Sequence, residues 1–330
     1  MDFVDSRIFL TYHVIIKIFK HVRKQMGGRY IDLQVNGYRG INFSDPGLSA
    51  EDIRTVSRLL GDRGVAAYCP TLISSPHETY AHNLPLLASA AGEEGPGARI
   101  LGIHLEGPFL NPAPGPRGIH EAENIVPPNI DYFHKLSDLC QDTLALITIA
   151  PDQSGSTELI EHICSTTRAA VSLGHHLAGE KQIKDAVEAG ARAATHVGNG
   201  LPTMIHRHEN PLWTILSDDR LYAFFIADGY HLPQALTSVI LRSKPPGKLI
   251  ITSDLMHLGG LPSGSYEIGK LKVLLEKNGR LHQEGSSQLA GASLPIDRCA
   301  EYMEKICGVS KERVHAMTYT NPLKLLDKTL

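Results

Sequence analysis

The sequence predicts an α/β fold in which eight parallel strands and their helices form a (β/α)8 barrel. Short β-rich runs alternate with helix-like stretches from about residue 30 onward. The runs are dominated by Val, Ile, Leu, Ala and aromatic residues, which is typical of parallel strands buried on both faces. Eight such units follow one another, and this number favours a closed barrel over a doubly wound open sheet.

Eight runs are expected to form the barrel strands, in this order: Tyr30–Val35, Val65–Thr71, Ile100–Leu105, Leu144–Ala150, Ala169–Leu173, Ala193–His196, Leu221–Ala227 and Leu249–Ser253. Helical patterns lie between them, among them Ala50–Arg63, Gly179–Ala189 and Pro233–Arg242. A glycine, which commonly ends a helix, precedes the next strand at three places: Gly64, Gly190 and Gly247.

The chain after the eighth strand is expected to add smaller elements to the same domain. Lys270–Leu281 reads as a hairpin, because the Asn278-Gly279 pair favours a tight turn. A helical section, Ile296–Cys307 and then Lys311–Leu325, follows. The Pro- and Gly-rich stretch Asn111–Gly118 is a loop, since barrel units continue after it. We therefore expect one barrel domain over residues 29–330, preceded by an N-terminal extension over residues 1–28.

The composition is that of an ordinary globular protein, with 42% hydrophobic and 20% charged residues among 330. A net charge of -3 argues against a nucleic-acid partner. Five cysteines, an odd number with no C-x-x-C pair, favour a reducing cytoplasm over a disulfide framework. The apolar run Ile8–Phe19 is shorter than the roughly 20 residues of a transmembrane helix. An interfacial helix and an atypical N-terminal extension both remain open for this run.

Side chains that can bind metal or move protons follow five of the expected strands. Glu106, His175, His196, Asp228 and Asp254 each stand at such a strand end. In a parallel barrel these ends meet on the face that carries the active site. One carboxylate and two imidazoles form a familiar single-metal site with a position left for water. Each residue alone could be a cap or a structural side chain, but together they predict a metal-dependent active site.

At these residues the sequence resembles the N-acetylglucosamine-6-phosphate deacetylases, which belong to the amidohydrolase superfamily. The resemblance extends from about residue 30 to residue 325. The run His-Leu-Glu-Gly-Pro-Phe, combined with Gln-Val-Asn-Gly, is its most specific part. The matching segments are Ile31–Gly37, His104–Phe109, Ser172–His175, Thr195–His196, Ile226–His231, Ser253–Asp254, Leu289–Gly291 and Thr320–Pro322.

The resemblance implies removal of the acetyl group from N-acetyl-D-glucosamine 6-phosphate. It implies one divalent metal ion per subunit held by Glu106, His175 and His196, with zinc expected first and iron, cobalt or manganese as alternatives. Asp254 would be the catalytic acid and base. Most superfamily relatives carry His-x-His where this chain has Gln34 and Asn36. Because amides are poorer ligands, we expect a single metal, with these two residues and His120 supporting the site.

The resemblance also implies a set of substrate contacts. Arg207 matches the phosphate-binding arginine of the family, which reaches into the neighbouring subunit, so a homodimer is implied. Ile119 stands at a contact position in another loop. The full set expected to touch the phosphorylated amino sugar is Ile119, Asn199, Gly200, Arg207, Asp228, His231, Leu289, Ala290 and Gly291.

Three departures from the family leave alternatives open. The small β-sandwich of the family is expected to be largely absent, which fits either a truncated coding sequence or a compact form. The loop after His196 differs from the family, and its extra histidines are expected to contact substrate or support the site rather than bind metal. His257 receives no role. Besides the deacetylase, a deacylase of another N-acyl sugar or amide and an inactive barrel that binds a partner therefore remain open.

Overall fold

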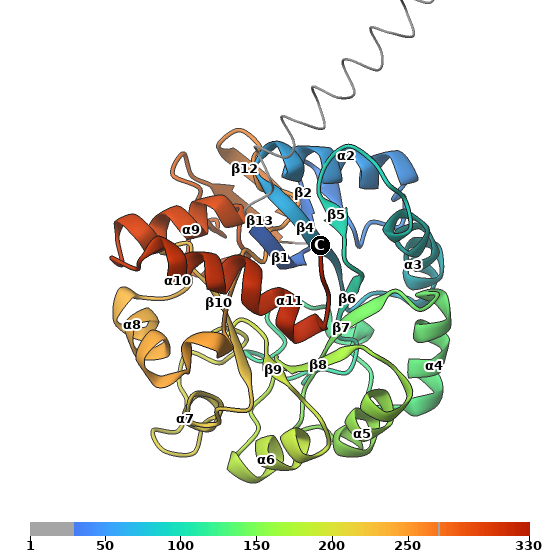
Figure 1. Cartoon of the computed structure of the whole chain (residues 1–330), viewed down its shortest axis with the longest axis vertical. Coiled ribbons are helices and arrows are strands. Elements are labelled where there is room, and N and C mark those ends of the chain that lie inside the picture. Colours follow the sequence, from blue (N-terminus) through green and yellow to red (C-terminus); the bar gives the residue numbers. More distant parts are fainter. Residues whose placement is uncertain (1–29, 270) are drawn as a thin grey trace, which may run out of the picture.

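The computed structural model describes residues 30–269 and 271–330, and these form the expected barrel. Neighbouring strands are parallel in the order β1-β4-β6-β7-β8-β9-β10-β11, and a bridge between Val35 and Leu255 brings the last strand back to the first. Figure 1 shows the helices around this ring of strands. The barrel strands are β1 Tyr30–Val35, β4 Val65–Ile73, β6 Ile103–Glu106, β7 Leu144–Ile149, β8 Ala170–Leu173, β9 Ala193–Ala194, β10 Tyr222–Ile226 and β11 Leu249–Thr252.

The third expected strand is the one that differs most from the sequence prediction. Ile100–Leu105 is divided into β5 Arg99–Ile100 and β6, and Gly102 lies at the break. Gly102 has a φ of 148°, and a Cβ there would lie 2.5 Å from the carbonyl oxygen of Thr143. The close approach of the two backbones therefore requires glycine and interrupts the strand.

The helices between the strands follow the predicted periodicity. In α2, Ser49 and Asp52 form a capping box, and Ile53, Val56 and Leu60 face the core. The helices are α2 Ala50–Asp62, α3 His77–Ala91, α4 Ile130–Leu139, α5 Ser156–Thr166, α6 Glu180–Glu188, α7 Pro211–Ser217, α8 Gln234–Ser243, α9 Ile296–Lys305, α10 Lys311–His315 and α11 Asn321–Leu326, with a π-helical turn, Ala316–Thr320, between the last two.

Two of the three predicted glycine stops are confirmed. Gly64 and Gly190 have φ values of 81° and 115°, which a glycine adopts without strain. The prediction for Gly247 is wrong, because this residue lies in a 3-10 turn, Pro246–Lys248, beyond the helix. Helix α8 ends at Ser243 because Lys244 precedes Pro245, and a residue before proline is driven into the extended conformation.

The hydrophobic core has two layers. Alternate strand residues such as Ile147, Val171 and Ile251 pack against the surrounding helices. A second cluster, which includes Leu146 and Ala170, fills the barrel and also contains Leu325 and Leu326 of α11. Figure 1 shows α11 lying across the ring of strands. Because Lys328 donates to the carbonyl of Leu101, just before β6, this helix closes the amino end of the barrel and leaves the opposite end for the site.

Outside the barrel, the described residues form a three-stranded antiparallel sheet and a two-stranded ribbon. The sheet consists of β12 Gly264–Ile268, β13 Leu271–Leu275 and β14 Leu281–Gln283, and the ribbon of β2 Gly37–Tyr38 and β3 Ile41–Asn42. The hairpin at Asn278-Gly279 is thus confirmed, although its second strand continues to Gln283. Strand β12 was not predicted, because its residues are only half-buried and carry little apolar signal.

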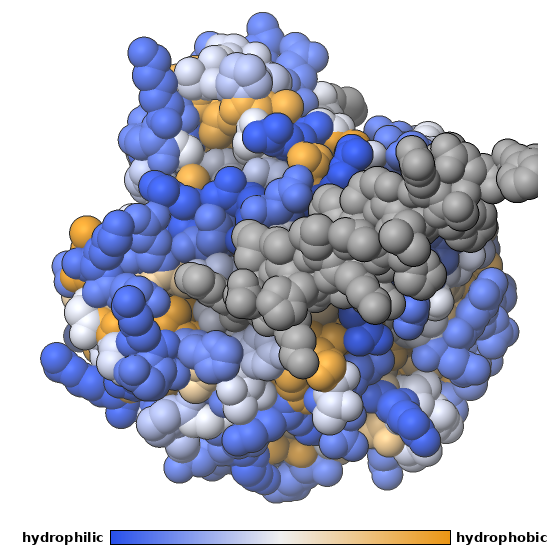
Figure 2. Space-filling view, turned by 45° about the horizontal axis from the view of Figure 1, so that its top comes forward, coloured by the Kyte–Doolittle hydropathy of each residue, from blue (hydrophilic) through white to orange (hydrophobic). Residues whose placement is uncertain are grey.

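On the face drawn in Figure 2, hydrophilic residues cover most of the surface and hydrophobic residues form small separate patches. No helix among the described residues is long and apolar enough to cross a membrane. The predictions for Ile8–Phe19 and for the extension over residues 1–28 lie outside the described residues.

Candidate metal centre and active site

The carboxyl end of the barrel brings the candidate metal ligands together. Glu106 is the last residue of β6, while His175 and His196 follow β8 and β9 by two residues. The side-chain atoms Oε1 of Glu106 and Nε2 of His175 lie 3.2 Å apart, and Oε1 and Nε2 of His196 lie 2.9 Å apart. The two Nε2 atoms are 3.0 Å from each other. All three residues are buried, so three ligand atoms converge on one point away from bulk water.

The imidazole of His175 is held in an orientation suited to a metal ligand. Its Nδ1 lies 2.7 Å from the carbonyl oxygen of Pro116, which can only accept a hydrogen bond. The proton is therefore on Nδ1, and Nε2 presents its lone pair to the centre. A Cβ at Gly118 or Gly200 would lie 3.4 Å or 3.2 Å from this ring, so two loops pack closely on it. The aromatic ring of His120 also lies against it, with centroids 4.5 Å apart.

The backbone at three site residues adopts the left-handed conformation. The φ values are 56° at His175, 29° at His196 and 51° at Asp254. For a residue with a side chain this conformation costs roughly 1–2 kcal/mol. Such residues persist where surrounding contacts determine the backbone, and they concentrate at functional sites.

Two amides from β1 and the segment after it complete the inner part of the site. The side-chain amide of Gln34 donates to Glu106 over 2.7 Å, and that of Asn36 donates to Asp254 over 2.7 Å. The oxygen of each amide is buried and has no hydrogen-bond partner among the described residues. Buried acceptors without partners are rare, so these two oxygens indicate that a further group belongs here.

A divalent metal ion fits the residues present. Carboxylate oxygen and imidazole nitrogen are ligands that zinc and similar ions accept, and three protein ligands leave a position for water. The tautomer of His175 and the unpartnered amide oxygens agree with a site completed by a cation and its water. The buried group Glu106, His175 and His196 could therefore hold a metal ion.

The charges of the inner site are shaped by burial and by close contacts. Burial alone would raise the pKa of Glu106, but the close contacts of its carboxylate with the imidazoles of His175 and His196 hold that pKa well below its usual range. The loss of solvation raises the pKa of Asp254 to about 8, and the negative charge of Glu106 adds to this effect. Burial lowers the pKa of His120 to about 3. Glu106 is thus ionised, His120 is neutral, and Asp254 favours its protonated form more than an exposed aspartate does.

Asp228 and His231 form a second, tightly bonded pair after β10. Oδ2 of Asp228 lies 2.7 Å from Nδ1 of His231, and Oδ1 accepts from the backbone N–H groups of Tyr230 and His231. Burial alone would raise the pKa of Asp228, but the hydrogen bond from His231 brings that pKa below its usual value. The pair fixes the imidazole of His231 with Nε2 turned away from Asp228.

The other predicted substrate contacts lie in loops around this face. Asn199 donates to the backbone carbonyl of His196 over 3.3 Å, so it lies close to a candidate ligand. The segment Leu289–Gly291 is held beside the end of β11, because Met256 donates to the carbonyl of Ala292. Ile119 is 44% exposed. Arg207 is also exposed, and within the described residues only its backbone carbonyl has a partner, Trp213. The structure therefore does not connect Arg207 with the inner site.

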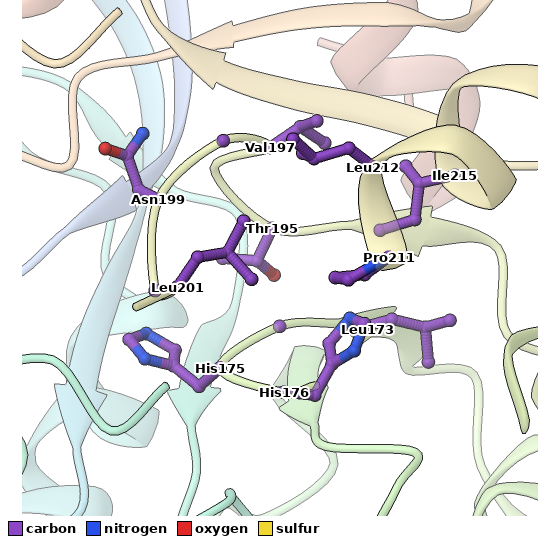
Figure 3. Close-up of a pocket in the computed structure, with 13 residues that line it drawn as sticks. Leu173, His175, His176, Thr195, Val197, Asn199, Leu201, Pro211, Leu212 and Ile215 are labelled. Carbon is purple, nitrogen blue, oxygen red and sulfur yellow. The ribbon is translucent and has the colours of Figure 1, made fainter. Parts of the chain in front are cut away.

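A cavity of about 20 Å³ lies behind the candidate ligands, between the segment after β8, the loop after β9 and α7. Figure 3 shows the rings of His175 and His176, which are consecutive in the chain, turned to different sides of it. This volume accommodates about one water molecule but no sugar. A surface hollow of about 920 Å³ beside α6 and α7 is lined by none of the predicted site residues.

Two groups that hold the site were not predicted. The carbonyl of Pro116 orients His175, and nothing in the sequence marks one carbonyl within a Pro- and Gly-rich loop. Asp32 is buried in β1 and accepts hydrogen bonds from Thr252 and Ser253. The sequence did contain a signal for Asp32, since a carboxylate inside a mostly apolar strand is costly unless it has hydrogen-bond partners.

The fold and the inner site together define a barrel of the metal-dependent amidohydrolase type. No family model matches the sequence. Among curated proteins, the human N-acetylglucosamine-6-phosphate deacetylase is 33% identical over 323 residues, covering 92% of this chain and 76% of its own length. The Bacillus subtilis protein of the same name is 31% identical over 299 residues, covering 90% and 74%. The chain belongs to the N-acetylglucosamine-6-phosphate deacetylase family.

A relative with a different name and two solved structures extend this result. An Escherichia coli N-acetylgalactosamine-6-phosphate deacetylase is 29% identical over 298 residues, covering 90% of this chain and 77% of its own length. The Pasteurella multocida deacetylase structure matches with a TM-score of 0.80 at 25% identity, covering 90% of this chain and 76% of that one. A Mycobacterium smegmatis deacetylase in complex with N-acetyl-D-glucosamine-6-phosphate has a TM-score of 0.80 at 24% identity, covering 90% and 77%. The predicted fold class is thereby confirmed.

Proposed function

We propose that the chain hydrolyses N-acetyl-D-glucosamine 6-phosphate to D-glucosamine 6-phosphate and acetate. The observation that carries this proposal is the convergence of Glu106, His175 and His196 at the carboxyl end of the barrel. Asp254 follows β11 at the same end, so a carboxyl group is available to move protons. Membership in the deacetylase family supports the substrate class.

Glu106, His175 and His196 would hold one divalent cation, and we propose zinc, with iron, cobalt or manganese as alternatives. A bound cation supplies two things to amide hydrolysis: it lowers the pKa of a coordinated water to roughly 7, and it polarises the acetyl carbonyl. Gln34 supports this role because its amide donates to Glu106 and fixes the orientation of that carboxylate. The binding of one metal ion and not two is supported by the side-chain amides at positions 34 and 36, which are poor metal ligands.

Asp254 would accept a proton from the attacking water and return it to the nitrogen of the leaving amine. A group that does both needs a pKa near the working pH, and the protein environment raises the pKa of Asp254 toward this range. The amide of Asn36 donates to one carboxylate oxygen of Asp254. That bond leaves the other oxygen for the proton transfers.

His231 and Arg207 would bind the phosphorylated sugar. Asp228 holds Nδ1 of His231, so its Nε2 is left to contact the sugar or the phosphate. A guanidinium can grip phosphate with two parallel hydrogen bonds, which suits Arg207 to the phosphate itself. The remaining contacts we propose are Ile119, Asn199, Gly200, Asp228, Leu289, Ala290 and Gly291, and His120 would support the site by packing on His175.

A second candidate substrate is N-acetylgalactosamine 6-phosphate. The Escherichia coli relative that is named for this sugar aligns over 90% of the chain. The two sugars differ only in the orientation of one hydroxyl group, so the metal site and Asp254 would serve both. The loop after His196, which differs from the family pattern, is where such a change of specificity would arise.

Acetate release from a panel of sugars tests these alternatives. The protein, loaded with zinc, is given N-acetylglucosamine 6-phosphate, N-acetylgalactosamine 6-phosphate and unphosphorylated N-acetylglucosamine. We expect the highest kcat/KM for the first, and a value about 10- to 100-fold lower without the phosphate, because a charge-assisted contact is lost. Equal rates with and without phosphate would contradict the phosphate assignment. Release from none of them by folded, metal-loaded protein would favour the inactive binding barrel.

We further propose a homodimer in which Arg207 serves the site of the neighbouring subunit. Its exposure and its lack of side-chain partners among the described residues support this arrangement. Coexpression of R207A and D254N chains tests it. At substrate concentrations well below KM, where R207A alone is slow, half of the dimers contain one intact site if Arg207 acts across the interface, so the mixture recovers about one quarter of the wild-type rate. If Arg207 acts within its own chain, no site is intact and no recovery occurs.

We propose residues 29–330 as one catalytic domain that works in a reducing cytoplasm. The unbroken run of barrel units from β1 to β11 supports the first part, and five free cysteines support the second.

A further inference from the structure

Asp32 lies where the first and last strands of the barrel meet. Among the described residues, only the bridge between Val35 and Leu255 pairs these strands, so they lack a continuous ladder of backbone hydrogen bonds. Oδ1 of Asp32 accepts from the backbone N–H of Ser253 over 3.1 Å. The carboxylate therefore replaces a backbone partner that the neighbouring strand does not supply.

The same carboxylate fixes the side chain of Ser253. The hydroxyl of Ser253 donates to Oδ2 of Asp32 and accepts from the backbone N–H of Leu255 over 3.1 Å. A hydroxyl has one proton, so its donation to Asp32 determines that its lone pair faces Leu255. Ser253 therefore bonds directly to the buried carboxylate of Asp32, and Leu255 is linked to it through the Ser253 hydroxyl. These two residues lie on either side of Asp254.

The residue between them needs such support. Asp254 has a φ of 51°, and this conformation costs roughly 1–2 kcal/mol for a residue with a side chain. The carbonyl of Leu255 accepts from the backbone N–H groups of Asn36 and Gly37, which fixes the chain beyond Asp254 as well. Only 1% of Asp32 is exposed, so it can be neither a substrate contact nor a surface charge.

We propose that Asp32 is a positioning residue for Asp254. By holding both the N–H and the hydroxyl of Ser253, it keeps the left-handed turn that directs the carboxyl group of Asp254 toward the reacting water. This inference rests on the proposed function, since it assigns Asp32 a role in that reaction. It also predicts that the effect of Asp32 passes through Ser253, and not through the barrel core in general.

The test compares substitutions that remove different hydrogen bonds of the same carboxylate. S253A removes the hydroxyl bond, and D32N disturbs the acceptor for both Ser253 groups. T252V is the matched control, because the hydroxyl of Thr252 also donates to Oδ1 of Asp32, over 2.9 Å, but does not bond to Leu255. S253T retains a hydroxyl at position 253 and serves as the conservative variant.

We expect S253A and D32N to lower kcat by about 10- to 100-fold, as for residues that orient a catalytic group. KM and metal content should change less than about twofold, T252V should stay within about threefold of wild type, and S253T should recover most of the loss. The double variant should be no slower than the slower single variant, because both act through one contact. Equal losses in T252V and S253A, or a rise in KM at constant kcat, would overturn the proposal.

The wild type in the same assay separates this inference from the proposed function. If wild type releases acetate but D32N and S253A match it, Asp32 has no positioning role and the function stands. If wild type releases none, the proposed function fails, and crystal structures decide about Asp32. A displacement of the Asp254 carboxyl group by about 1 Å or more in D32N supports the inference, because such a shift affects catalysis strongly. An unchanged Asp254 contradicts it.

Discussion

The inner and outer parts of the candidate site are built in different ways. The inner part, with Glu106, His175 and His196, is buried and joined by hydrogen bonds from several strands. The outer part consists of loops, and its predicted phosphate ligand, Arg207, is exposed without a side-chain partner among the described residues. The chemistry of the inner part can therefore be inferred from the residues of a single chain. The residues of the outer part would find their partners only in a bound substrate or in a second subunit.

This difference indicates where function can change within the fold. Replacing a residue of the inner part would disturb a buried network, because Gln34, His175 and His196 all contact the same carboxylate oxygen of Glu106. Within the loop that carries Arg207, residues 206–209 are exposed, so the sequence of this part can vary at little cost. We thus expect changes in the inner part to abolish the reaction and changes in the outer part to alter substrate preference.

The largest effect is expected from loss of a metal ligand. E106Q removes the negative charge of the carboxylate that Gln34, His175 and His196 contact. H196A removes one candidate ligand atom. Both should lose the bound ion and lower kcat/KM by about 10⁴-fold, since the water is no longer activated. Elemental analysis and acetate release measure the two effects. H257A is the matched control for H196A, and equal metal loss in H257A would show that any histidine loss destabilises the site.

A slightly smaller effect is expected from the proton-transferring residue. D254N should keep its metal and lower kcat by about 10²–10⁴-fold, the usual contribution of a general acid and base. D142N controls for the backbone, because Asp142 also has a left-handed φ, of 62°, but is exposed in a loop before β7. Turnover by D254N close to wild type would remove Asp254 from the mechanism.

In the outer part we expect a change in binding more than in turnover. R207A should raise KM for the phosphorylated sugar by about 10- to 100-fold and leave unphosphorylated N-acetylglucosamine almost unaffected. K181A, on the exposed surface of α6, controls for the loss of one positive charge. If R207A instead loses metal, the distinction between the inner and outer parts is wrong.

The smallest expected effect is on stability and concerns Asp32. Burial raises the pKa of Asp32 from 3.8 to about 6, so the folded protein favours its protonated form. Between pH 3.8 and about 6 the folded state binds more protons than the unfolded state, so the stabilisation by protonated Asp32 is complete below pH 3.8 and is lost as the pH rises through 6. Relative to D32N, wild type should lose roughly 2 kcal/mol of unfolding free energy between pH 4 and pH 7. Urea unfolding at several pH values measures this difference, and a constant difference would contradict the shifted pKa.

Most of the fold could be predicted from the sequence because buried parallel strands carry a simple signal. Tyr30–Val35 is apolar at four of its six positions and forms β1 with the predicted bounds. The break at Gly102 could not be predicted, since it depends on the carbonyl of Thr143, which is distant in the sequence. The exposed strand β12 lacked the apolar residues on which such predictions rest.

The inner site was predictable for a related reason. The barrel places the ends of its strands together, so the position of Glu106 at the end of β6 already predicted its neighbours. The bonds from Asp32 to Ser253 and from Pro116 to His175 could not be derived, because they join segments whose spacing is set by packing.

The central claim is that one cation and Asp254 act together at the end of the barrel. Titration of zinc into metal-free protein, with acetate release from N-acetylglucosamine 6-phosphate measured at each step, tests it most directly. We expect the rate to rise linearly and stop rising at one ion per chain, while D254N binds the same single ion without comparable turnover. Full activity in metal-free protein, or a rate that saturates only at two ions per chain, would contradict the claim.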